Sequence, residues 1–190
     1  MFEHYDFFLI VDLESTCCND NSIPKGEGEI IEIGAVIVDA CSLDVIDEFT
    51  SFIKPINYPV LTHFCSELTT ITQNNVDCAP SFPVAIEAFY LWLNAYQNSV
   101  FCSWGNYDRN HLVSSCQAYQ VNNQLEDHEH INLKKAFART QKVKPMGMKW
   151  ALELAGIKLI GTHHRGIDDT KNIAKLMPYI LGIKNVNPIL

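Results

Sequence analysis

Apolar and polar positions along the chain predict strands in its first half. Residues 7–11 form an unbroken apolar run, as in a strand buried on both faces, and residues 30–38 are rich in β-branched side chains. Residues 45–53 alternate as a third strand, and residues 100–104 form a short fourth one. Because the loop between the second and third predicted strands is short, we expect antiparallel neighbours among these early strands.

Helical spacing dominates the second half. Residues 82–93, 133–140 and 148–155 each carry an apolar stripe, and Gly156 stands where the last of these should end. A final helix has its stripe at Ile173, Leu176, Met177 and Ile180, with Pro178 expected to kink or shorten it. Strands first, and then a strand among helices, predict an α/β fold: a mixed sheet flanked by helices in a single domain over residues 1–190.

Two carboxylates stand at the end of the first predicted strand. Asp12 and Glu14 are two residues apart, so their side chains point to the same face of the sheet. Acids beside apolar neighbours are costly unless a basic partner, a hydrogen-bond network or a metal ion neutralises them. No Lys or Arg precedes Lys25. The pattern favours a divalent metal ion, with a solvated loop as the alternative.

Two more acids stand at the boundaries of predicted elements. Asp108 follows the strand at 100–104 and opens a helix, where a sheet presents ligands at its edge. Asp169 is four residues before Ile173 and so lies on the buried stripe of the last helix. Asp168 is rotated away from that stripe and is expected to be the N-cap.

His163 and His164 precede these acids in a loop beside a glycine. Four carboxylates converging with one histidine suit two Mg²⁺ or Mn²⁺ ions about 4 Å apart, which stabilise the attacking and leaving oxygens in phosphodiester cleavage. A histidine with a pKa of about 6.5 can take the proton of the attacking water. Spacing alone leaves two registers open, His163 with Asp168 or His164 with Asp169.

Composition and charge narrow the classes of partner. The chain is 47% hydrophobic and 19% charged, which indicates a globular protein. Its net charge of −8 opposes nucleic-acid binding, but residues 101–190 hold twelve basic residues against seven acidic ones. Residues 134–149 contain six basic residues and no acid. This segment suits phosphate contacts, and a solvated helix face explains it equally.

Cysteines and the N-terminus bear on location. The seven cysteines form no C-x-x-C pair and fit reduced, mostly buried thiols better than disulfides or a zinc site. The N-terminus lacks a basic stretch followed by an apolar one, and no apolar run approaches a membrane span. We therefore expect a cytoplasmic protein without a membrane partner, and no obligate protein partner is evident.

Three motifs, in this order, resemble the DEDDh family of 3′→5′ exonucleases. They are Val-Asp-Leu-Glu-Ser-Thr-Cys at 11–17, Cys-Ser-Trp-Gly-Asn-Tyr-Asp at 102–108, and His164 five residues before Asp169. Residues 64–73 and 163–170 look like the branch that trims the 3′ ends of histone mRNA and small RNAs, together with its bacterial relatives. The resemblance covers about residues 5–180.

The resemblance implies an RNase H-like fold with a catalytic core over about residues 5–181. It implies that the carboxylates binding two divalent metal ions, Mg²⁺ or Mn²⁺, are Asp12, Glu14, Asp108 and Asp169, and that His164 is the general base. Arg165 stands where a tyrosine-type relative would have its tyrosine, which favours the histidine subtype.

The candidate substrate contacts are Leu13, Ser15, Thr16, His63, Phe64, Leu68 and Arg165. The first three would meet the 3′-terminal nucleotide, and the next three would wedge or stack on its base. Core packing is the alternative for Leu13 and Phe64, and a hydrogen bond that stabilises the loop is the alternative to phosphate contact for Arg165. Glu32 is a candidate for orienting a ligand from behind the site. His128 and His130 are expected in a surface loop and are assigned no metal.

The expected function is a metal-dependent 3′→5′ exonuclease that hydrolyses single-stranded RNA or short RNA 3′ ends to nucleoside 5′-monophosphates. A DNA exonuclease of the proofreading type is the enzymatic alternative, because contacts to the 2′-OH decide between the two polymers. A nucleic-acid-binding or scaffold protein on the same fold is the alternative without catalysis.

Overall fold

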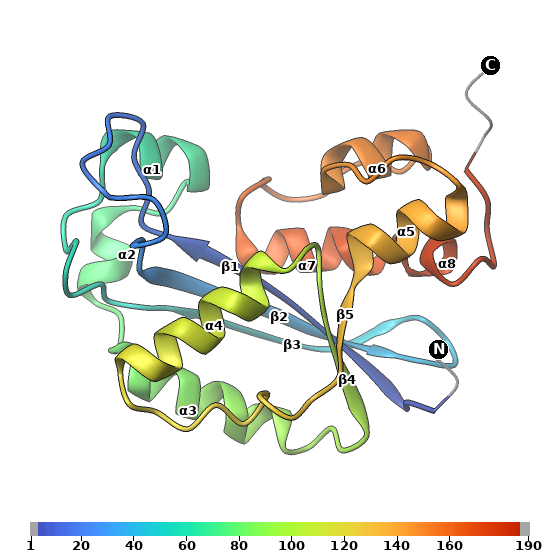
Figure 1. The fold of residues 1–190 in the computed structure, drawn as a ribbon, viewed down its shortest axis with the longest axis horizontal. Coiled ribbons are helices and arrows are strands. Elements are labelled where there is room, and N and C mark those ends of the chain that lie inside the picture. The colour runs from blue at the N-terminus through green and yellow to red at the C-terminus, as the bar shows by residue number, and fades with distance from the viewer. Residues whose placement is uncertain (1–3, 187–190) are drawn as a thin grey trace.

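The computed structural model describes residues 4–186 as an α/β fold built on one five-stranded sheet (Figure 1). The strands are β1 (Phe7–Ser15), β2 (Ile30–Asp39), β3 (Val45–Phe52), β4 (Ser99–Ser103) and β5 (His130–Asn132). Across the sheet they run β3-β2-β1-β4-β5; the first three pair antiparallel, while β4 is parallel to β1 and β5 to β4. The predicted mixed sheet is confirmed. The two ends of the predicted domain, 1–3 and 187–190, lie outside the described residues.

Helices cover both faces of the sheet (Figure 1). They are α1 (His63–Thr69), α2 (Gln73–Asp77), α3 (Phe82–Leu93), α4 (Tyr107–Ala118), α5 (Leu133–Gln141), α6 (Met148–Leu154), α7 (Gly166–Ala174) and α8 (Met177–Ile180). One core cluster joins the sheet to α5 through α8, and a second joins its other face to α3 and α4. No helix in the described part of the chain has the length and apolar character needed to cross a bilayer.

The apolar run of β1 is explained by burial on both faces. Phe8 and Ile10 pack into the cluster under α7, while Leu9 packs into the cluster under α3. Because side chains alternate along a strand, Asp12 and Glu14 continue the row of Phe8 and Ile10. The two acids therefore face α7 and lie at the end of that apolar row.

A close approach of two backbones sets the position of α7. A Cβ atom built on Gly34 of β2 would lie 2.1 Å from the carbonyl carbon of Gly166 and 2.2 Å from the nitrogen of Ile167. One built on Gly166 would lie 2.9 Å from the carbonyl oxygen of Asp12. Only glycine at both positions lets the N-terminus of α7 sit directly on β1 and β2.

Two predictions about local structure are wrong in detail. The last predicted helix is two helices, because α7 ends at Ala174 and Pro178 stands in the first turn of α8. His130 belongs to β5 and not to a surface loop, and its Nε2 is 2.8 Å from the Ser103 hydroxyl of β4. By contrast, the predicted end of the helix at Gly156 is confirmed: Gly156 follows the C-cap Ala155 of α6 with a φ of +69°, the left-handed conformation that glycine adopts without strain.

Candidate active site

Three carboxylates meet where β1 passes under α7. Asp12 and Glu14 come from β1, and Asp169 comes from the first turn of α7. One oxygen from each carboxylate lies within 4.8 Å of the others, and Glu14 and Asp169 are buried. The sequence predicted the positions of these acids from two independent patterns, the period of two along β1 and the helical stripe of α7. In the structure the three acids lie together.

The fourth acid is held by the backbone of β1. Asp108 is buried in the first turn of α4, and its Oδ1 accepts a hydrogen bond of 3.2 Å from the Leu13 amide. All four acids line one cleft of about 520 Å³ between β1, α4, α6 and α7. The structure therefore brings together all four carboxylates predicted from the sequence.

Burial and mutual repulsion make these acids hard to ionise together. Burial, followed by the charge of Asp108, raises the pKa of Asp12 well above its usual range. Burial, followed by the charge of Asp169, raises the pKa of Glu14 to about 8. Burial also raises the pKa values of Asp108 and Asp169, opposed at Asp108 by the Leu13 amide and at Asp169 by His163. Such a cluster requires added positive charge to be fully ionised at neutral pH.

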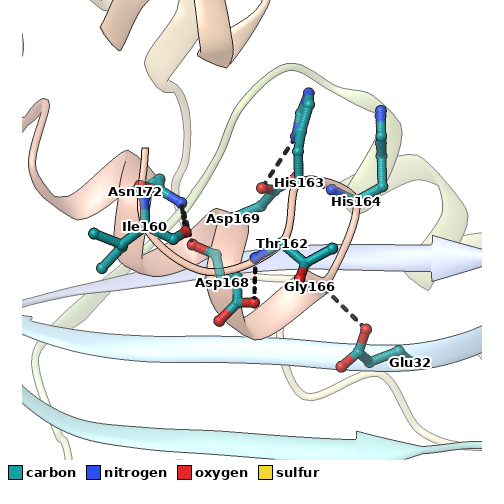
Figure 2. Close-up of polar contacts among 9 residues, drawn as sticks. All are labelled: Glu32, Ile160, Thr162, His163, His164, Gly166, Asp168, Asp169 and Asn172. Carbon is teal, nitrogen blue, oxygen red and sulfur yellow. Dashed lines mark hydrogen bonds and ion pairs between the residues drawn. The ribbon is translucent and has the colours of Figure 1, made fainter. Parts of the chain in front are cut away.

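Both histidines of the 163–164 pair line the same cleft. The Nδ1 of His163 is 3.0 Å from Oδ2 of Asp169 (Figure 2). The backbone amide of His164 donates to the same oxygen at 3.1 Å. His164 has a φ of +66°, which costs a non-glycine residue roughly 1–2 kcal/mol. The two rings stack with their centroids 4.0 Å apart. Burial, and then His163, lowers the pKa of His164.

Asp168 does not cap α7. The N-cap is Arg165, and Asp168 stands in the first turn, where its Oδ2 accepts a hydrogen bond of 2.7 Å from the Thr162 amide (Figure 2). Asn172 holds the preceding segment through both backbone groups of Ile160. These contacts fasten the histidine loop to α7, so the two acids have different roles: Asp168 supports the loop and Asp169 faces the cleft.

Glu32 and Arg165 form a buried pair behind the acids. Glu32 is fully buried on β2, and its carboxylate accepts hydrogen bonds from the Arg165 guanidinium at 3.0 and 3.2 Å and from the Gly166 amide at 3.0 Å. Arg165 also lies over the Phe52 ring. The structure therefore contains the hydrogen bonds that the loop-stabilising alternative for Arg165 predicted.

The predicted substrate residues have different surroundings. Leu13 lines the cleft. Ser15 and Thr16 are buried: the Ser15 hydroxyl accepts from Tyr107 at 3.3 Å, and the Thr16 hydroxyl accepts from the Glu29 amide at 2.8 Å. Three predicted substrate contacts lie on α1 and do not line the cleft: His63, Phe64 and Leu68. Of these, His63 is exposed and 3.2 Å from Glu67.

Four aromatic or charged side chains line the cleft although the sequence did not predict them as site residues: Trp104, Tyr107, Lys149 and Trp150. Tyr107 precedes Asp108, and its ring stacks on His111. Trp150 belongs to α6, and its side chain is 67% exposed. The basic segment 134–149 ends at Lys149 within this helix, so charge was the one sequence signal that pointed to this region.

The mixed sheet with its row of acids under α7 defines a protein of the RNase H-like class with a carboxylate centre suited to divalent metal ions. The RNase T family model, described as Exonuclease, matches residues 9–177. The chain therefore belongs to this exonuclease family, in its DEDDh 3′→5′ group.

Named relatives span nearly all of the chain. ERI1 exoribonuclease 2 of Danio rerio is 33% identical over 194 residues, covering 92% of this chain and 35% of the relative. The human 3′-5′ exoribonuclease 1 is 31% identical over 182 residues, covering 91% of this chain and 52% of the relative. The chain thus spans about a third to a half of these relatives.

A solved structure has nearly the same extent. The nuclease domain of 3′hExo, a DEDDh family member bound to rAMP, is 28% identical with a TM-score of 0.86, and the match covers 98% of each chain. A second structure, of a 3′-exonuclease recognising the histone mRNA stem-loop, matches with a TM-score of 0.87 and 28% identity, covering 95% of this chain and 65% of that one.

Proposed function

We propose that this chain is a metal-dependent 3′→5′ exonuclease that hydrolyses single-stranded RNA or short RNA 3′ ends to nucleoside 5′-monophosphates. The observation that carries the proposal is the convergence of four carboxylates and two histidines in one cleft. Relatives named exoribonucleases and a related domain bound to rAMP support RNA over DNA. The cytoplasmic location stays a prediction.

The chain's residues have separable tasks in this reaction. The carboxylates that would hold two Mg²⁺ or Mn²⁺ ions are Asp12, Glu14, Asp108 and Asp169. Such ions, when bound, stabilise charge on the attacking and leaving oxygens. The Leu13 amide fixes Asp108, and the His164 amide fixes Asp169.

Hydrolysis also needs a proton acceptor. The water oxygen forms a bond to phosphorus while the bond to the upstream 3′ oxygen breaks, and that 3′ oxygen takes a proton from solvent. The products are a 5′-monophosphate and a strand that is shorter by one nucleotide and ends in a 3′-hydroxyl. We assign the proton of the water to an imidazole nitrogen of His164. Burial lowers the pKa of this residue, so its ring is neutral at pH 7 and free to accept. The ring of His163 instead contacts Asp169.

The first test is a time course on 5′-labelled single-stranded RNA and DNA of the same sequence, with Mg²⁺, with Mn²⁺ and with a chelator. We expect a metal-dependent ladder that shortens from the 3′ end, faster on RNA. A faster ladder on DNA would favour the DNA exonuclease. Binding without a ladder on either polymer would favour the scaffold.

The second test separates the two histidines. His164→Ala should slow hydrolysis about 100-fold or more, with metal affinity largely retained, and should remove the fall in rate at acid pH. His163→Ala is the matched comparison, because it deletes the stacked neighbour and its contact with Asp169 but leaves the proposed base, so the fall in rate at acid pH should remain. Loss in His163→Ala with activity kept in His164→Ala would reverse the assignment.

A further inference from the structure

The outer edge of the cleft carries an aromatic side chain that the fold does not use. Trp150 lines the cleft with the acids, yet its side chain is 67% exposed. Within the described part of the chain its indole makes no hydrogen bond or ring contact. Its helix is anchored by Met148, Ala151 and Leu152, all of them buried. Trp150 therefore contributes little to the core and presents flat aromatic surface beside the site.

A second tryptophan of the cleft is structural by comparison. The Nε1 of Trp104 donates to the Met146 carbonyl oxygen at 3.1 Å, and its ring contacts Phe137 at a centroid distance of 6.0 Å. Its indole is already engaged in holding the segment before α6. Of the two indoles in the cleft, that of Trp150 is the one available to a substrate.

Charge differs between the two sides of the cleft. Lys149 lines the cleft beside Trp150, at the end of the basic segment 134–149. Figure 1 shows α1 and the loop after β1 at the end of the sheet across from α6; this region, outside the cleft lining, carries Asp20, Glu27 and Glu67 against the single lysine Lys25, whereas the basic segment 134–149 holds six basic residues and no acid before Glu153 of α6. A strand whose terminal phosphate lies on the acids would leave the cleft over α6, where basic charge attracts its phosphates.

We propose that Trp150 and Lys149 bind the nucleotide next to the 3′-terminal one, Trp150 by stacking on its base and Lys149 by contacting its phosphate. This inference rests on the proposed function. The scissile phosphate belongs to the terminal nucleotide and must reach the buried acids, so the exposed rim meets the next nucleotide upstream. Because every base has an aromatic face, stacking on Trp150 would strengthen RNA binding without a preference for one base sequence.

The test combines a protein change with a matched substrate change. We would measure KM and kcat for Trp150→Ala on a single-stranded RNA and on the same RNA lacking the base next to the 3′-terminal nucleotide. Trp150→Ala should raise KM about tenfold on the intact RNA. Removing that base should raise KM of the wild-type protein similarly, and the two changes together should add little. Trp150→Phe should restore most of the affinity.

Two control variants match the changed residues in kind. Leu91→Ala removes an apolar side chain that is also 67% exposed, on α3 on the other face of the sheet, and Lys54→Ala removes a lysine distant from the basic segment. Both should leave KM unchanged. Lys149→Ala should raise KM a few-fold at low salt, with a smaller effect as salt rises.

Two outcomes overturn the inference. One is an unchanged KM of Trp150→Ala on the intact RNA. The other is a further increase in the KM of this variant on the RNA lacking the base, as large as the increase seen with the wild-type protein. A separate assay distinguishes failure of the proposed function from failure of this inference. In it the wild-type protein is tested on a nitrophenyl ester of a nucleoside 5′-monophosphate, which has no upstream nucleotide. If the wild-type protein cleaves neither this ester nor RNA, the exonuclease proposal fails and this inference fails with it.

Discussion

Replacing Gly34 by alanine tests whether the contact between β2 and α7 positions the site. The new Cβ would lie 2.1 Å from the Gly166 carbonyl carbon, and ordinary contact begins at 3.4 Å, so α7 must move by about 1.3 Å. The obstacle is backbone on both sides, which cannot rotate away as a side chain would. Gly34 has no positive φ, so backbone strain is not the cause of the effect.

The expected cost follows from overpacking. Inserting a methyl group into a closed backbone contact destabilises the folded state by about 1–3 kcal/mol. Alanine also lowers the entropy of the unfolded chain relative to glycine, which offsets less than about 1 kcal/mol of this cost. Asp169 stands three residues after Gly166, so the same movement displaces a proposed metal ligand. A displacement of about 1 Å in such a site costs roughly 100-fold in rate. We expect Gly34→Ala to lose about 2 kcal/mol of unfolding free energy and most of its activity.

The assay pairs urea unfolding with the RNA time course. Gly147→Ala is the control: a Cβ there would lie 3.8 Å from Cδ1 of Trp150, and Gly147 is an N-cap with a φ of −62°, so the loss should stay below about 1 kcal/mol. If Gly34→Ala unfolds at the wild-type urea concentration and hydrolyses RNA at the wild-type rate, the reasoning about this contact is wrong.

Three further predictions concern the acids and their partners. Asp12→Asn should abolish hydrolysis while the metal-free protein stays folded at pH 8, because asparagine has nearly the same shape and cannot add to the repulsion among the acids; circular dichroism and the RNA ladder check this, and a surviving ladder contradicts the two-metal proposal. Because the folded state raises the pKa of Glu14 from 4.5 to about 8, metal-free stability should fall between pH 4.5 and 8. Mn²⁺ should reverse this fall in thermal unfolding, Glu14→Gln should reduce it, and a flat metal-free profile would refute the linkage. Arg165→Ala should cost about 3–5 kcal/mol in urea unfolding, because it leaves Glu32 buried without its cation, and wild-type stability would contradict this.

Local patterns in the sequence determined the elements and the four acids. The period of two along β1 put Asp12 and Glu14 on one face, and the helical period put Asp169 on the buried side of α7. Both periods are set by backbone geometry within a few residues, so they can be read without knowledge of the fold. The same reasoning failed at His130, because a strand of three residues is too short to show a period.

Only the tertiary structure decided what surrounds those acids. The pairing of Arg165 with Glu32 joins residues 133 positions apart, and the contact of Leu13 with Asp108 joins residues 95 apart. No local period encodes such distances; they follow from the strand order and from the glycine contact that seats α7 on the sheet. The placement of Trp150 at the cleft has the same origin. The sequence alone does not distinguish an exposed tryptophan on a short helix from other surface residues. Trp150 lies at the cleft only because packing places its helix beside the end of β1.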